Sequence, residues 1–375
     1  MKKRVLCILV AVLTTFGSVC AFAEETQDIE STSLYDTYST MISVDDSDLT
    51  PITLDEAITK TINNSSAVKQ TVASLELQED NLEIAANQLT YSSSDNLSTA
   101  ISLIKSQVTY KNSIISQNSE KESLKYSVKQ AYIEIIEAQR ELKLAAETIE
   151  TDKKNLEIAK IKNKMGTLSA HDLNEQNLSY EKALSNLANK EIALEADYIA
   201  LNVLMGVDIN NRYSFQLPVE YEELNLSIPL ESYINSAVSK ASSVKQKENS
   251  LDLAKQQFVV TAATSETVGS YASAKNSADT AEMNLADAKT SVAETLRKLY
   301  NTITESEISI SNNMKELETL KVKLETAQTK YEMGTASLVE LETAKSNVAT
   351  MENTIISSLY AHMLNVEKFN NPDLL

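Results

Sequence analysis

The chain has little of what tight turns, thiol chemistry and metal binding need. Its 375 residues include no tryptophan, five glycines, four prolines, two cysteines and two histidines. So few glycines and prolines leave little turn chemistry, which argues against an all-β fold of many short strands. The residues that are abundant, among them Ala, Leu, Lys, Glu and Ser, favour long helices.

Catalytic and nucleic-acid signatures are also missing. A formal net charge of −19 works against nucleic-acid binding. The sequence contains no G-x-x-x-x-G-K-[ST], no G-x-G-x-x-G and no H-E-x-x-H motif. His171 and His362 have no cysteine or second histidine at ligand spacing, so we expect surface or packing roles for them. We therefore predict a protein that is not an enzyme, with no catalytic, cofactor-binding or metal site.

The first 23 residues have the pattern of a secretory signal. A positive start at Lys2 to Arg4 precedes a mostly apolar run from Val5 to Val19, and Ala21-Phe22-Ala23 fits a cleavage site. The alternative is a retained anchor, although the run is short for a spanning helix. The residues before Cys20 do not fit a lipoprotein signal. Cleavage would remove both cysteines and take the net charge from −19 to −22.

Residues 24–50 predict an acidic, flexible leader, because they contain Ser, Thr, Asp and Glu but no Lys or Arg. The alternative is a short strand around Met41 to Val44 that pairs with the body of the protein. Thr53 with Glu56 then forms a capping-box pattern that predicts a helix start. Helical periodicity continues to about Thr90, with a weak break at Asn63 to Ser66.

A much longer helix is predicted from about Leu97 to Lys164. At about 1.5 Å per residue it would be on the order of 100 Å long. Gly166 ends it, and Ser169 with Asp172 predicts the start of a return helix that stops at Gly206. Both helices carry apolar residues at heptad spacing, as in coiled coils. The seam residues are Val128, Tyr132, Ile135, Leu142, Ala146, Ile149 and Leu156, then Leu173, Tyr180, Leu184, Leu187, Leu194, Tyr198, Leu201 and Met205.

The second half of the chain repeats the first. Leu54 and Val68-Lys69-Gln70 match Leu230 and Val244-Lys245-Gln246 at an offset of 176, whereas Tyr132 matches Tyr300 at 168. The segment between the halves alternates polar and apolar residues and contains two prolines, which indicates a linker with a short strand pair at most. The predicted organisation is signal 1–23, leader 24–50, first helical hairpin repeat 51–206, linker 207–229 and second helical hairpin repeat 230–375.

The two predicted hairpin tips share one pattern. Met165-Gly166-Thr167-Leu168-Ser169-Ala170-His171-Asp172-Leu173 and Met333-Gly334-Thr335-Ala336-Ser337-Leu338-Val339-Glu340-Leu341 both read Met-Gly-Thr-x-Ser-x-x-acid-Leu. In the second tip, Ser337 with Glu340 is again a capping box, and the last helix is predicted to reach about Phe369. The Gly, Ser and acidic residues can all be explained as helix caps.

Together these features resemble the outer membrane efflux protein (TolC) family. The resemblance rests on Leu54-Asp55-Glu56-Ala57-Ile58 followed by Asn63-Asn64, on Ala131-Tyr132 within a long helix, on the two tip patterns and on the duplication. It implies an all-α fold of two tandem coiled-coil hairpins in a helical tube or bundle, and a homotrimer. It also implies that the tips dock on a membrane-fusion adaptor protein that links the protein to an inner-membrane or ABC-type transporter. The partner-binding residues carried over are Gly166, Thr167, Leu168, Ser169, Ala170, Asp172, Leu173, Gly334, Thr335, Ser337, Leu338, Val339, Glu340 and Leu341.

One departure from the family pattern concerns the end opposite the tips. Family members place membrane strands between the first two helices of each half, and a strand hairpin needs roughly 20 alternating residues. The intervals Leu89 to Tyr110 and Val259 to Ala281 do not alternate cleanly. We therefore expect an absent or vestigial β-barrel, with the helices meeting at plain turns near Ser92 to Asn96 and Val268 to Ser270.

Two functions from different classes remain open at this point. The first is a non-enzymatic transport component, related to efflux or secretion ducts, that is exported across the cytoplasmic membrane to the cell envelope or beyond. The family itself places such ducts in the outer membrane. The alternative is a secreted coiled-coil structural or binding module of the cell envelope that has no channel.

Overall fold

The structure is a computed structural model that describes residues 49–91, 97–215, 217, 221–264 and 268–375. The predicted signal, nearly all of the predicted leader, the alternative strand at Met41 to Val44 and the turn at Ser92 to Asn96 lie outside the described residues. Residues 49–375 form one compact unit. Its elements in chain order are β1 (Thr50–Ile52), α3 (Leu54–Asn64), α4 (Ser66–Tyr91), α5 (Leu97–Lys164), α6 (Ala170–Met205), β2 (Tyr213–Phe215), α7 (Leu230–Lys240), α8 (Ser242–Thr264), α9 (Val268–Glu332), α10 (Leu338–Asn370) and the 3₁₀ helix η2 (Pro372–Leu374).

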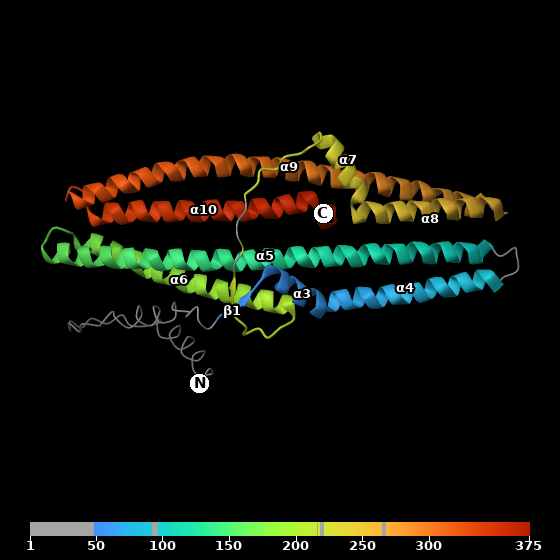
Figure 1. Ribbon diagram of the computed structural model, residues 1–375, viewed down its shortest axis with the longest axis horizontal. Coiled ribbons are helices and arrows are strands. Elements are labelled where there is room, and N and C mark those ends of the chain that lie inside the picture. Colours follow the sequence, from blue (N-terminus) through green and yellow to red (C-terminus); the bar gives the residue numbers. More distant parts are fainter. Residues whose placement is uncertain (1–48, 92–96, 216, 218–220, 265–267) are drawn as a thin grey trace. The chain divides into compact units, whose positions relative to one another are not determined.

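The helices pack as two similar hairpin repeats that lie side by side. α5 packs against both α4 and α6, and α9 packs in the same way against α8 and α10. α5 also contacts α8 and α10, which joins the two repeats. The helices form one layer. In the half where α6 and α10 lie, the order across the layer is α6, α5, α10, α9, and in the half where α4 and α8 lie it is α4, α5, α8, α9 (Figure 1). The all-α expectation of two tandem hairpins is confirmed.

Each repeat has its own apolar core. One cluster joins α3, α5 and α6 with β1 and β2 around Tyr132, Leu201 and Met205, all three fully buried. The other joins α7, α8, α9 and α10 around Leu296 and Phe369. The predicted heptad seam supplies the first cluster, which is why the long helices stay paired over many turns. Among the described residues, none of the helices combines enough length and apolar character to cross a membrane.

The short sheet was not predicted as it occurs. β1 and β2 pair in parallel, with Thr50 opposite Tyr213 and Ile52 opposite Phe215. The predicted strand pair within the linker is therefore wrong in its partner, because the linker strand pairs with residues just before the first helix. The hydroxyl of Tyr132 donates to the Ile52 carbonyl over 2.9 Å, which ties β1 to the middle of α5.

Two further expectations need correction near the start of α9. Val268 to Ser270 was expected to be a turn, but α9 begins at Val268 and these residues are helical. The break expected within that turn, at Gly269, is also wrong, because Gly269 lies in the first turn of α9. A Cβ added at Gly269 would meet nothing within 4 Å. An exposed helical glycine costs only about 1 kcal/mol relative to alanine, so it did not stop the helix.

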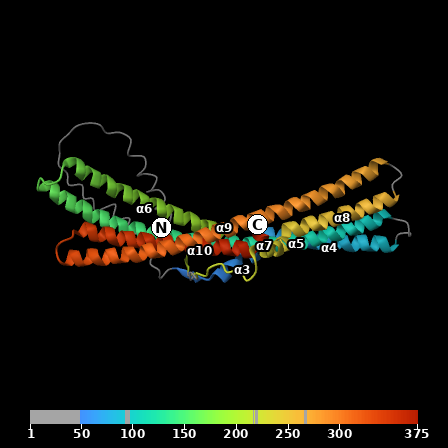
Figure 2. The same ribbon diagram turned by 90° about the horizontal axis from the view of Figure 1, so that it is seen from above.

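The change of the repeat offset from 176 to 168 means that the first repeat has eight more residues than the second between its first two helical segments. These residues lie mainly in longer helices. α4 has 26 residues and α8 has 23, while α5 has 68 and α9 has 65. Six of the eight extra residues therefore lengthen two helices of the first repeat. The C-terminal ends of α4 and α8 and the N-terminal ends of α5 and α9 lie at the end opposite the α5–α6 and α9–α10 turns, as two views at right angles show (Figure 1, Figure 2).

Candidate functional site

The first tip is a tight turn built on a left-handed glycine. Gly166 has φ +72°, which lets the amide of Thr167 reach back to the Lys162 carbonyl over 2.9 Å. This pattern, in which the chain turns at a glycine just past the helix end, satisfies the last carbonyls of α5. The Asn163 side chain then donates to the Leu168 carbonyl over 3.0 Å and closes the turn.

The second tip has the same geometry. Gly334 has φ +74°, and the Thr335 amide donates to the Lys330 carbonyl over 2.8 Å. The threonine hydroxyl of each tip also donates to the lysine carbonyl five residues earlier, over 3.0 Å in both cases. The repeated sequence pattern therefore forms the same turn at both tips.

The return helices are capped as predicted, with one difference. Ser337 and Glu340 form a complete capping box, with both reciprocal hydrogen bonds present. Ser169 accepts a hydrogen bond from the Asp172 amide over 3.1 Å, but the reciprocal bond is missing. Aspartate is one methylene shorter than glutamate, so its carboxylate does not reach back to the Ser169 amide.

Each tip presents an exposed methionine next to its glycine. The exposed fraction is 65% for Met165 and 66% for Met333. Leu168 and Leu338 are half-buried, so part of each apolar side chain is exposed to solvent. Leu341, by contrast, is 6% exposed and packs within its own hairpin.

The remaining predicted tip residues fall into the same two groups. Leu173 is half-buried like Leu168, and only its outer part is available to a partner. The other predicted partner-binding residues are exposed, namely Gly166, Thr167, Ser169, Ala170, Asp172, Gly334, Thr335, Ser337, Val339 and Glu340.

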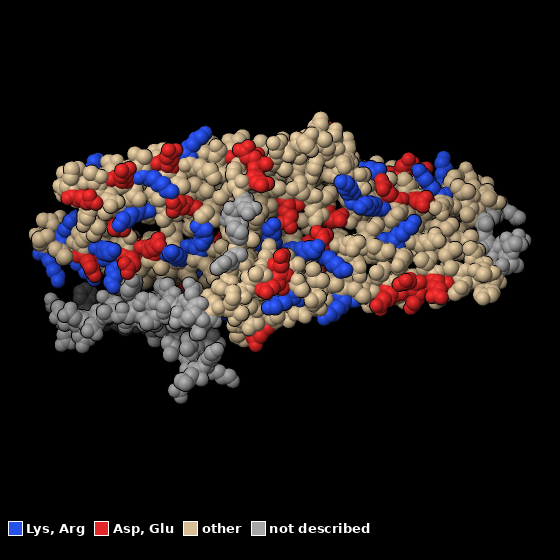
Figure 3. All heavy atoms as spheres, viewed as in Figure 1, with Lys and Arg blue, Asp and Glu red and all other residues tan. Residues whose placement is uncertain are grey.

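The two tips differ in charge. The last turns of α5 carry exposed Lys160, Lys162 and Lys164, and Figure 3 shows Lys and Arg side chains interspersed with Asp and Glu in that half of the molecule. The second tip carries one lysine, Lys330, with Glu332 and Glu340 beside its turn, whereas the acidic residue of the first tip is Asp172. Lysines at a helix C-terminus also interact favourably with the helix dipole, which accounts for part of this pattern.

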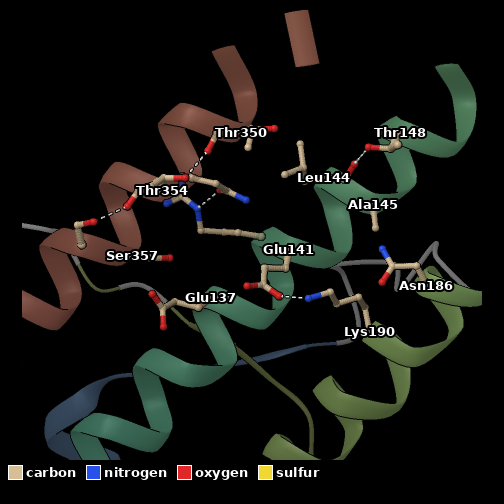
Figure 4. Close-up of a pocket in the computed structure, with 13 residues that line it drawn as sticks. Glu137, Glu141, Leu144, Ala145, Thr148, Asn186, Lys190, Thr350, Thr354 and Ser357 are labelled. Carbon is tan, nitrogen blue, oxygen red and sulfur yellow. Dashed lines mark hydrogen bonds and ion pairs between the residues drawn. The ribbon is translucent and has the colours of Figure 1, made fainter. Parts of the chain in front are cut away.

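A groove runs between the two repeats, with α5 as its floor and α6 and α10 as its walls (Figure 4). Its volume is about 490 Å³. Arg140 donates from Nε to Oδ1 of Asn353 over 3.2 Å, which links α5 to α10. Lys190 of α6 forms an ion pair with Glu141 of α5, also visible in Figure 4.

Burial perturbs an acid in this groove. Loss of solvent raises the pKa of Glu137, while the hydrogen bond from Ser357 of α10 opposes this shift. Further along the same seam, Lys129 of α5 pairs with Glu367 of α10. These three α5–α10 pairs are polar, in contrast to the apolar core inside each repeat.

The two histidines have the roles expected from the sequence. His171 is exposed at the first tip, 3.5 Å from the Glu175 carboxylate. His362 is 3% exposed, with its ring 3.1 Å from both Ser306 Oγ and the Glu222 carbonyl. It fastens the linker to the α9–α10 hairpin, which is a packing role.

One contact joins two sequence motifs that are distant in the chain. The Asn64 side chain donates to the Met205 carbonyl over 2.8 Å, beside Gly206 with φ +65°. Asn64 belongs to the opening motif and Gly206 to the end of the return helix, 142 residues later in the sequence. No local pattern pairs them, because their proximity depends on the hairpin returning to its start.

The comparisons with known proteins agree with this architecture. No protein-family model and no curated protein matches the sequence. Among solved structures, CusC matches with a TM-score of 0.69 at 12% identity, covering 87% of this chain and 92% of its own. The outer membrane protein VceC of Vibrio cholerae matches with 0.66 at 11%, covering 84% and 94%. The CmeC outer membrane channel of Campylobacter jejuni matches with 0.64 at 13%, covering 95% and 90%. At such identities the likeness shows the fold alone, and the chain therefore has the TolC-like fold of these outer-membrane proteins, as its motifs indicated.

Proposed function

We propose that this protein is a non-enzymatic component of an export or efflux assembly in the cell envelope. In this proposal it docks through the Met165–Leu173 and Met333–Leu341 tips on a membrane-fusion adaptor, which links it to an inner-membrane or ABC-type transporter. The observation that carries the proposal is the pair of tips. They are equal in turn geometry and in methionine exposure, and both lie at one end of a TolC-like helical layer.

Two features of the tips favour docking over a purely structural role. Capping accounts for the glycines, the serines and the acidic residues, but it does not require an exposed Met165 or Met333. Methionine is enriched in protein–protein interfaces relative to the rest of the protein surface. The lysines of one tip and the glutamates of the other add charge that can fix orientation and partner choice.

The proposal includes assembly into a homotrimer. A single chain provides two hairpins. In the half of the layer that ends in the tips, the outermost helices α6 and α9 carry apolar residues that no part of the described chain covers. Ile192 is 62% exposed on α6, and Val322 is 60% exposed on α9. Contact between the α9 edge of one copy and the α6 edge of the next would be head-to-tail, which generates a ring when the rotation closes.

The first test is the oligomeric state and its dependence on the tips. The mature protein should be a trimer by light scattering. Met165→Asp with Met333→Asp should leave the trimer intact, because the tips lie away from the helix edges, and should abolish capture of an adaptor protein. Ile84→Asp, at an exposed position on α4, is the matched control and should capture the adaptor as the wild type does.

The alternative reading predicts different results. A secreted coiled-coil module without a channel would be monomeric, or would behave identically with and without the tip substitutions. Either outcome would sink the docking proposal.

A further inference from the structure

A buried histidine holds part of the linker against the second repeat. His362 of α10 is 3% exposed and contacts both α9 and the linker segment 221–224. Its Nε2 lies 3.1 Å from the Glu222 carbonyl oxygen, and its Nδ1 lies 3.1 Å from Ser306 Oγ. One imidazole ring therefore joins three segments that are far apart in the sequence.

The groups around the ring indicate which of its nitrogens carry a proton. A carbonyl oxygen can only accept, so Nε2 must donate to Glu222. The Ser306 hydroxyl has one proton and donates it to the Ile303 carbonyl over 2.7 Å. Its oxygen is then an acceptor for Nδ1 of His362. Both ring nitrogens therefore face acceptors, which fits the doubly protonated imidazolium rather than the neutral ring.

A carboxylate on α9 supplies the opposite charge. Glu307 Oε1 lies 3.9 Å from His362 Nε2, and the two side chains are 17% and 3% exposed. The same oxygen accepts a hydrogen bond from the Leu224 amide over 2.6 Å. Within the described residues no lysine or arginine pairs with Glu307, so a charge on His362 is what compensates this carboxylate. The charged pair thus also holds the backbone of the linker.

The other titratable groups near the ring are uncharged, exposed or paired elsewhere. The ring centroids of Tyr221 and His362 are 5.4 Å apart. Burial, helped by the charges of Glu223 and Glu307, raises the pKa of Tyr221, which keeps its hydroxyl neutral. Glu222 and Glu223 are exposed to solvent. On the α5 side of α10, the charged side chains each contact another α10 residue, namely Arg140 with Asn353, Lys129 with Glu367 and Glu137 with Ser357.

The internal repeat shows that helix packing does not require this polar cluster. At the offset of 168, the positions of His362, Ser306 and Glu307 are occupied in the first repeat by residues that carry no charge, namely Leu194, Ala138 and Gln139. Leu194 packs against the apolar core of its repeat. The first repeat therefore builds the same helix pair without the histidine, the hydroxyl or the carboxylate.

We infer that His362, Ser306 and Glu307 form a pH-responsive latch, which holds the linker segment 221–224 on α9 and α10 while the His362 ring carries both of its protons. Histidine ordinarily changes its charge between about pH 5 and 8. Loss of one proton removes the charge that faces Glu307. It also leaves one ring nitrogen opposite an acceptor, unless Ser306 turns its hydroxyl away from Ile303. The latch is therefore closed at lower pH and loosens as the pH rises. This inference goes beyond the proposed function and depends on neither docking nor a trimer.

Nuclear magnetic resonance can follow the ring directly, because residues 24–375 contain only two histidines. In mature protein labelled with nitrogen-15 histidine, both ring nitrogens of His362 should have imidazolium shifts at a pH at which the exposed His171 has lost one proton. His171→Gln removes the second set of signals and fixes the assignment. Glu307→Gln copies the first repeat, and it should make His362 lose its second proton at a lower pH than in the wild type. A His362 ring that titrates together with His171 would overturn the inferred protonation state.

Hydrogen exchange measured by mass spectrometry tests the linker itself. After correction for the intrinsic pH dependence of exchange, segment 221–226 should exchange about 10- to 100-fold faster once His362 has lost a proton, because hydrogen bonds to charged groups are the stronger ones. His362→Leu copies Leu194, so it should keep the helix content but show the faster exchange at every pH. His171→Gln is the matched control and should behave as the wild type does. A linker in H362L that is as protected as in the wild type, or that still slows on acidification, would overturn the latch.

Discussion

Alanine substitution at the three left-handed glycines should lower the free energy of unfolding by clearly different amounts. Gly166, Gly206 and Gly334 have φ between +65° and +74°, a region that costs other residues about 1–2 kcal/mol. An added Cβ at Gly166 or Gly334 meets nothing within 4 Å, whereas at Gly206 it would lie 2.9 Å from the Cβ of Asn64. Alanine at either tip should therefore cost only the backbone strain.

At Gly206 two further costs add to that strain. The close approach must be relieved by moving α3 away from α6, and this movement also threatens the hydrogen bond from Asn64 to the Met205 carbonyl. Such a bond contributes about 0.5–1.5 kcal/mol. We expect Gly206→Ala to lose roughly 2–4 kcal/mol and Gly166→Ala about 1–2 kcal/mol.

Urea unfolding followed by circular dichroism measures both losses. The double variant Asn64→Gly with Gly206→Ala removes the Cβ that blocks the site, so its loss should be smaller than the sum of the two single losses. Equal losses for G206A and G166A, or a strictly additive double variant, would refute the reasoning.

Three further predictions concern caps, a buried hydroxyl and an acid. Ser337→Ala removes the complete capping box of α10 and should lower the free energy of unfolding by about 1 kcal/mol, measured by the urea midpoint. Tyr132→Phe removes the donor to the Ile52 carbonyl and should cost about 1 kcal/mol in the same assay. Because burial raises the pKa of Glu137, the folded protein holds that proton more tightly than the unfolded chain. The free energy of unfolding of the wild type, relative to that of Glu137→Gln, should therefore rise as the pH falls from neutral through the raised pKa toward the ordinary glutamate pKa. A difference between the two proteins that does not change with pH would contradict this.

The helical part of the fold could be predicted from sequence because its signals are local. Leu97 to Lys164 was predicted as one helix, and α5 has these bounds. The heptad spacing predicts which face is buried, and Gly166 supplies the left-handed stop. These signals lie within a few residues of the feature that they specify.

The sheet and the groove could not be predicted, because their partners are distant in sequence. β1 has three residues and includes Pro51, so its alternation is too short to detect, and its partner β2 begins at Tyr213. The stripe of Glu137, Arg140 and Glu141 is recognisable as one face of a helix. Nothing in the sequence around it indicates that α10 would cover that face.

The predictions about the tips and about the division of the chain are only partly tested by the structure. Sequence predicted the turns, the caps and the identity of the two tips, and the geometry agrees except that the Ser169–Asp172 cap lacks its reciprocal hydrogen bond. The docking role of the tip residues, the signal at 1–23 and the boundaries 51–206, 207–229 and 230–375 stay predictions. The packing within one chain does not show which of its exposed residues contact a partner.

The most direct test of the central claim is site-specific photo-cross-linking in living cells. A photoreactive amino acid at Leu168, and separately at Leu338, should cross-link the protein to one and the same adaptor, identified by mass spectrometry. The same amino acid at Ile84, on the exposed face of α4, should not. No adaptor product from either tip, or an equal product from Ile84, would contradict docking through the two hairpin tips.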